Sequence, residues 1–137
     1  YFAGRISDNR FVNKATHLGE WSKDQLYKSL TDYSNLVLLS DGEAHPLVCL
    51  EAMSAGLGLV LSKYATANLD LSLPFIDVIE EEDINNLSHV RTIIENNRQT
   101  SNRMRNEIRE YAKSFAWKKI INDMYVPTVE SICSGDR

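Results

Sequence analysis

Two glutamates stand eight positions apart around the start of an expected helix in the middle of the chain. Glu43 lies in a loop, and Pro46 suits the first turn of the helix that follows. Amides in a first helical turn have no partner within the helix, so those of Leu47 and Val48 could bind a phosphate or diphosphate. Carboxylates facing that anion would repel it. Glu43 and Glu51 are therefore better suited to hydroxyl groups, such as those of a sugar and a ribose.

The elements around this loop alternate between strands and helices. Three apolar runs predict strands, at residues 36–39, 58–61 and 75–79. The helix from Pro46 is expected to end at Gly56, in the left-handed conformation. This alternation predicts an α/β fold, with a parallel sheet and helices on both faces. Ligands of such folds bind at the carboxyl ends of the strands, which makes the loop of residues 40–46 the candidate site.

The chain before the first of these strands predicts three further elements. Short strands are expected at residues 1–4 and 15–19. Ser22 and Gln25 have the form of a capping box, which predicts a helix over residues 23–33.

The chain after the third strand is expected to be helical. The acidic run at residues 80–83 favours a helix start, and we interpret it as a solvated surface rather than a metal site. Thr100 is a candidate cap for another helix. Trp117 and Tyr125 mark a last helix, which is expected to be kinked or broken near Pro127. Both aromatic side chains are expected to pack against a core or a domain edge.

Composition and charge exclude several classes of protein. The chain has 137 residues, with 15 Lys and Arg against 19 Asp and Glu, so its net charge is −4. Nucleic-acid binders and polybasic membrane-surface proteins need a basic excess, and both classes are therefore disfavoured. No apolar run approaches the ~20 residues of a membrane span, and no signal peptide is evident. We expect a cytoplasmic protein, cut from a longer one because it begins without Met.

Cysteine and histidine offer no metal site. Cys49 falls in an apolar run and Cys133 in a polar tail, so two free thiols are expected rather than a disulfide. His17, His45 and His89 are isolated and no cysteine pair is present, which argues against zinc.

The loop and helix at residues 43–60 also carry a family resemblance. The matching residues are Glu43, then Glu51-Ala52-Met53, Gly56 and Leu59-Val60. They resemble the E-x7-E region of retaining glycosyltransferases of the GT-B fold, especially the family 4 group. That region typically reads Glu-Gly-Phe-Gly, four variable residues, then Glu-Ala-Met-Ala-x-Gly-x-Pro-Val-Val. Residues 18–22 and 115–120 also resemble family segments, so the similarity covers roughly residues 15–130.

The resemblance implies a Rossmann-like α/β domain that forms the C-terminal half of a GT-B enzyme. Such a domain binds a nucleotide-diphosphate sugar, whose sugar is transferred with retained configuration to an acceptor glycan, lipid or protein. Site roles follow from the motif: Glu43 would be catalytic at the donor sugar, Ala44, His45, Leu47 and Val48 would contact the sugar and diphosphate, Glu51 would hold the ribose, and Trp21 would lie near the nucleobase. No metal or other cofactor is implied.

The resemblance also implies what this chain lacks. Residues 1–133 would be the donor-binding domain without its first strand-helix unit, and residues 134–137 a frayed tail. The basic pair that grips the diphosphate, and the acceptor-binding N-terminal domain, would both precede Tyr1. The chain by itself is therefore expected to bind donor weakly and to transfer nothing.

Departures from the family pattern keep alternatives open. Ala44-His45-Pro46 replaces Gly-Phe-Gly, and Pro46 cannot donate an amide hydrogen bond. This departure favours a catalytically inactive nucleotide-binding or protein-interaction module of the same fold. A sugar-nucleotide epimerase is a third possibility. His45 also fits an ordinary loop residue, and Trp21 also fits simple packing.

Overall fold

The computed structural model describes residues 1, 16–42 and 46–134. The chain divides into two compact units, Tyr1–Asp32 and Tyr33–Arg137. The strand expected at residues 1–4 lies, apart from Tyr1, outside the described residues. Within the described residues 16–19, His17 makes a single β-bridge, and the strand predicted there does not form.

The first unit contains the helix that the capping box predicts. Helix α1 spans Lys23–Ser29 and continues as the 3₁₀ turn η2, Leu30–Asp32. The Gln25 amide donates to Ser22 Oγ at 3.3 Å, and the Ser22 amide donates to Gln25 Oε1 at 2.9 Å. These reciprocal bonds satisfy two amides that the helix itself leaves open, which explains where it begins.

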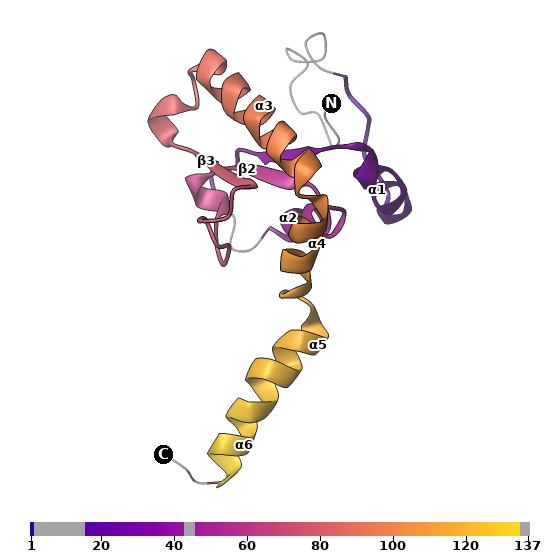
Figure 1. Cartoon of the computed structure of the whole chain (residues 1–137), viewed down its shortest axis with the longest axis vertical. Coiled ribbons are helices and arrows are strands. Elements are labelled where there is room, and N and C mark those ends of the chain that lie inside the picture. Colours follow the sequence, from indigo (N-terminus) through magenta and orange to yellow (C-terminus); the bar gives the residue numbers. More distant parts are fainter. Residues whose placement is uncertain (2–15, 43–45, 135–137) are drawn as a thin grey trace. The chain divides into compact units, whose positions relative to one another are not determined.

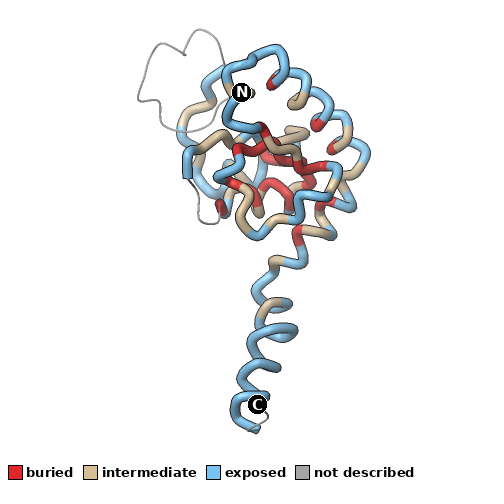
Figure 2. The backbone as a smooth tube through the Cα atoms, turned by 90° about the vertical axis from the view of Figure 1, so that its left-hand side faces the viewer, coloured by how far each residue is buried: buried red, intermediate tan, exposed pale blue. Residues whose placement is uncertain are grey.

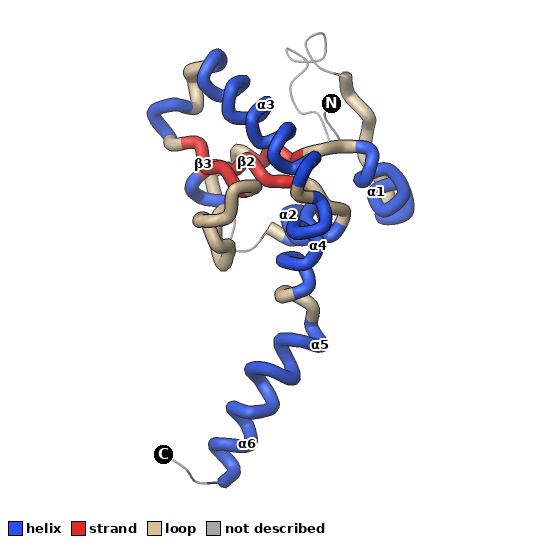
Figure 3. Tube along the Cα trace, viewed as in Figure 1, coloured by secondary structure: helices blue, strands red, loops and turns tan. Residues whose placement is uncertain are grey.

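The second unit is an α/β unit built on a small parallel sheet. Strands β1 (Asn35–Leu38), β2 (Gly58–Ser62) and β3 (Ile76–Ile79) lie in the order β1-β2-β3, as Figure 3 shows in red. The pairing sets Leu36 beside Leu59 and Leu61 beside Val78. The three predicted strands are confirmed, and so is the parallel arrangement.

Helices cover the sheet on both faces. Figure 1 shows α3 (Leu87–Arg103) on one side of the strands, with α2 (Leu47–Ser54) and α4 (Arg105–Lys113) on the other. Helix α2 follows the expected bounds, and Gly56 has the left-handed φ of +86° that its role after the helix requires.

The core of this unit follows from the central position of β2. All five residues of β2 are buried, as the red tube in Figure 2 indicates. Val60 packs with Ile79 and with Val90 of α3. Because side chains alternate along a strand, Leu59 and Leu61 point to the opposite face, where α2 lies. A strand covered on both faces has to be apolar throughout, which is why its sequence signal is strong.

The region between β3 and α4 differs from the prediction in two places. The acidic residues form a separate 3₁₀ turn, η4 (Glu81–Asp83), and α3 begins later, at Leu87. Asn86 caps α3 by accepting the His89 amide at 3.3 Å. The prediction that Thr100 caps a helix was wrong, because Thr100 lies inside α3. The break comes instead at Met104, where φ is −111°.

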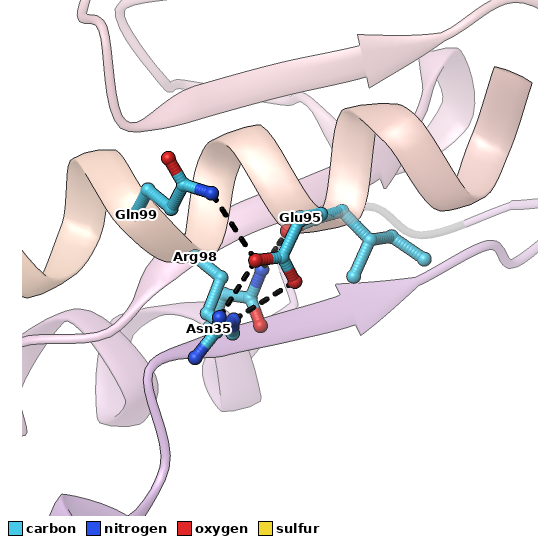
Figure 4. Close-up of polar contacts among 5 residues, drawn as sticks. Asn35, Glu95, Arg98 and Gln99 are labelled. Atoms are coloured by element: carbon cyan, nitrogen blue, oxygen red, sulfur yellow. Dashed lines mark hydrogen bonds and ion pairs between the residues drawn. The ribbon is translucent and has the colours of Figure 1, made fainter.

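A side-chain contact joins the first strand to α3. Asn35 Nδ2 donates to the carbonyl of Ile94 at 3.0 Å (Figure 4).

Beside it, Glu95 Oε1 lies 2.6 Å from the guanidinium of Arg98 and also accepts from Gln99. These donors, Arg98 above all, lower the pKa of Glu95 to about 2.

The chain ends in a run of helical segments. These are α5 (Trp117–Ile120), the π-helical segment η5 (Ile121–Tyr125) and α6 (Val126–Ser134). The helix is not broken near Pro127, because the three segments follow one another without a gap and Pro127 lies inside α6. The π-helical segment lies directly before the proline, which cannot donate to the turn that precedes it. The expected packing of Trp117 and Tyr125 was wrong: they are 78% and 66% exposed. Ser134 still belongs to α6, and the rest of the expected tail, residues 135–137, lies outside the described residues.

Among the residues that the structure describes, no helix is both long enough and apolar enough to cross a membrane.

Candidate functional site

The carboxyl ends of the three strands meet at one edge of the sheet. The loop after β1 leads to α2, the turn η3 (Lys63–Ala65) follows β2 directly, and η4 follows β3 after Glu80. Parallel strands direct these three connections to the same side, where α/β folds bind their ligands. The candidate site is therefore this edge, as the sequence predicts.

Helix α2 begins at this edge with an open first turn. Pro46 is its N-cap and is buried, and a proline ring has no polar atom with which to cap the helix. The Cys49 amide donates a hydrogen bond to the Pro46 carbonyl at 3.0 Å. The amides of Leu47 and Val48 lie ahead of the helical hydrogen-bond ladder, and Leu47 is 68% exposed. This arrangement can accept an anion along the helix axis.

Glu51 lies on the same face of α2 as Leu47, one turn further along. It is half-buried, whereas Cys49, Ala52 and Met53 are buried in the core. The Cα–Cβ bonds of a helix tilt toward its N-terminus, so Glu51 leans toward the open first turn. Its carboxylate is suited to accept hydrogen bonds from hydroxyl groups of a molecule bound there.

The structure brings together only part of the predicted site. Leu47, Val48 and Glu51 all belong to α2. Trp21 belongs to the first unit, where it is half-buried immediately before the cap Ser22. The remaining candidates, Glu43, Ala44 and His45, lie outside the described residues.

Four residues at this edge were not predicted as site residues: Ser40, Ser62, Lys63 and Glu81. Ser62 Oγ donates to the carbonyl of Ser40 at 2.5 Å and joins the end of β2 to the loop after β1. Lys63 Nζ lies 2.6 Å from Glu81 Oε2, across the ends of β2 and β3. Their position in the sequence could have identified them, because each lies at or just after the carboxyl end of a predicted strand.

Lys63 and Glu81 carry opposite charges in an exposed pair. Hydrogen bonding to Glu81 raises the pKa of Lys63, and the same contact with Lys63 lowers the pKa of Glu81. Tyr64 adds its hydroxyl to Glu81 at 3.1 Å, while its ring lies 4.9 Å from the Lys63 ammonium. Both groups therefore stay charged at neutral pH.

The described residues of this edge suit the binding of a polar ligand. Among the described residues, no group of three or more His, Cys, Asp and Glu side chains could hold a metal ion. The open helix start, the Lys63 ammonium and the Glu51 carboxylate suit a ligand with anionic and hydroxyl groups. Comparison of the chain with protein-family models, with curated proteins and with solved structures finds no match.

Proposed function

We propose that this chain is the donor-binding half of a retaining glycosyltransferase of the GT-B fold. The observation that carries the proposal is the open first turn of α2 at the carboxyl edge of the sheet, with half-buried Glu51 one turn further along the helix. This geometry suits a nucleotide-diphosphate sugar, whose diphosphate would bind the amides of Leu47 and Val48. Glu51 would accept hydrogen bonds from the ribose hydroxyls.

The same geometry suits the departure of a nucleoside diphosphate. As the bond to the sugar breaks, negative charge develops on the leaving oxygen. The amides and the positive end of the α2 dipole would stabilise that charge without a metal ion. Glu43 would contact the sugar, and the acceptor would be held by a separate N-terminal domain. The chain by itself would then bind donor but transfer nothing.

Nucleotide titration followed by amide chemical shifts tests the proposed site. UDP, GDP and ADP, and then their sugars, are added to the chain, and we expect shifts to cluster at residues 47–51 with one base preferred. Replacing Glu51 by Gln is expected to weaken the preferred nucleotide about tenfold, the usual effect of losing a charge-assisted hydrogen bond. Inorganic pyrophosphate, which has no ribose, should not bind the variant more weakly than the unchanged chain, because losing the Glu51 charge can only favour an anion.

The matched control is Glu107→Gln, which removes an equal charge from an exposed position of α4. It should leave the affinity for nucleotides unchanged. Shifts that avoid α2 at millimolar nucleotide, or equal effects of the two variants, would contradict the proposal.

The second candidate is a catalytically inactive nucleotide-binding or protein-interaction module of the same fold. Pro46 favours it, because a buried proline at the N-cap removes an amide that the family motif has available. Glu43→Ala separates the two in a polypeptide that includes the acceptor-binding domain. Loss of transfer with folding intact supports the enzyme, and unchanged behaviour supports the module.

A further inference from the structure

The loop that leads into α2 is joined to the turn that carries Lys63. Ser62 Oγ donates to the Ser40 carbonyl at 2.5 Å, and Lys63 is the next residue along the chain. Ser62 is buried and ends the central strand, so the backbone that carries Lys63 is held in place. The Lys63 side chain therefore projects from a fixed point at the same edge as the open turn of α2.

Ser40 provides an independent sign that something binds at this edge. Its Oγ is buried and finds no hydrogen-bond partner among the residues that the structure describes. Buried hydroxyls nearly always have a partner, and an orphaned one commonly marks the place of a water, an ion or a ligand atom. Ser40 lies in the connection between β1 and α2, and its carbonyl accepts from Ser62, the residue before Lys63.

The ion pair between Lys63 and Glu81 is of a kind that can dissociate. Both side chains are exposed, at 42% and 63%, and each stands at the start of a short 3₁₀ turn. Exposed ion pairs are weak, since water and salt compete with them. The ammonium also sits on a flexible four-carbon stem, which can turn away from Glu81 toward a stronger anion.

We propose that Lys63 is a specificity residue for the diphosphate, and that Glu81 occupies the place of that anion in the free protein. This inference rests on the proposed function and adds to it a cation supplied by the chain itself. When a diphosphate binds at the start of α2, the Lys63 ammonium leaves Glu81 and pairs with a phosphate oxygen. Because Glu81 competes for the same ammonium, the two residues have opposite effects on affinity.

The test compares the affinities of the Lys63 and Glu81 variants, which should change in opposite directions. Inorganic pyrophosphate and the preferred nucleoside diphosphate are titrated by calorimetry, with amide shifts followed in parallel. Lys63→Gln should weaken both ligands about threefold, the worth of one exposed ionic contact. Glu81→Gln should tighten both about threefold, because it frees the ammonium and removes a repulsive charge. Both effects should shrink as salt is raised.

A second exposed ion pair supplies the matched controls. Lys113 and Glu110 lie 2.5 Å apart on α4, with exposures of 68% and 70%. Lys113→Gln and Glu110→Gln make the same charge changes away from the site and should leave both affinities unchanged. If these controls shift affinity as much as the Lys63 and Glu81 variants do, the effect is one of net charge and the inference is wrong.

The outcomes separate this inference from the proposed function. Binding at residues 47–51 that depends on Glu51 but is indifferent to Lys63 and Glu81 overturns the inference and leaves the function standing. No binding of any nucleotide or pyrophosphate to the unchanged chain overturns both. Weaker binding with Lys63→Gln together with tighter binding with Glu81→Gln supports the inference.

Discussion

Asn97 is the buried polar residue that joins α3 to the sheet. Its Nδ2 lies 3.0 Å from the carbonyl of Leu59, 3.1 Å from that of Phe75 and 2.9 Å from Asp77 Oδ2. Ser101 Oγ, one turn later, donates to the Asn97 carbonyl at 2.7 Å. A buried amide stabilises a fold only when its partners are present, and here they come from two strands.

Replacing Asn97 by Ala should therefore destabilise the protein. The free energy of unfolding is expected to fall by about 1–3 kcal/mol, because buried carbonyls lose their donor. Urea unfolding measures the change. Asn96→Ala, at the exposed neighbouring position of α3, is the control and should stay within about 0.5 kcal/mol. Equal losses in the two variants would contradict the role given to Asn97.

At the scale of elements, α3 approaches the start of β2 closely. A Cβ added at Gly58 would lie 1.9 Å from Ser101 Oγ, 2.8 Å from Asn97 Oδ1 and 2.9 Å from the carbonyl of Phe75. The glycine is needed here for space. Any side chain would push the helix away from the strand or break the Asn97 contacts.

The Gly58→Ala variant tests this close approach. Overpacking at a tight site costs about 1–3 kcal/mol, and we expect the free energy of unfolding to fall by that amount. Gly42→Ala serves as the control, because a Cβ there meets no atom of the described residues within 4 Å. Thermal unfolding of both variants decides the matter: a Gly58→Ala protein as stable as the control would show that α3 does not pack so closely.

At the scale of the whole molecule, the last helical segments stand apart from the buried core. Residues 121–134 are all exposed, as the pale blue tube at the C-terminal end in Figure 2 indicates. Their apolar side chains include Met124, Tyr125 and Ile132, which are 65%, 66% and 74% exposed. This part of the chain takes its helical form from local hydrogen bonds, because it buries no residue of its own.

The exposure of Trp117 can be measured directly by fluorescence. In a Trp21→Phe variant, Trp117 is the remaining tryptophan, and its 78% exposure predicts water-like emission and strong quenching by acrylamide. The Trp117→Phe variant reports on half-buried Trp21 and should be quenched less. Blue-shifted, protected emission from Trp117 would mean that this segment packs against something in solution.

Local signals in the sequence were enough to predict most of the helices and strands. The apolar run of β2, the capping box at Ser22 and the left-handed position at Gly56 each act over a few residues, so each was predictable. The wrong prediction at Thr100 also rested on a local signal. A threonine hydroxyl can cap a helix, but Asn97 and Ser101 on either side of it are buried against the sheet, and α3 continues through Thr100. Trp117 misled as well, because apolarity alone does not say whether a packing surface exists.

In the candidate site too, local features were predictable from the sequence and long-range contacts were not. The sequence by itself predicted a helix from Pro46 and placed Glu51 one turn after Leu47, because helix periodicity sets that spacing. The structure begins the helix one residue later, at Leu47, with Pro46 as its N-cap. Only the tertiary structure decided that Ser62 meets Ser40, that Lys63 meets Glu81 and that Asn97 meets Leu59. These contacts join residues 22, 18 and 38 positions apart. Strand order and register bring such residues together, and no short-range pattern encodes either.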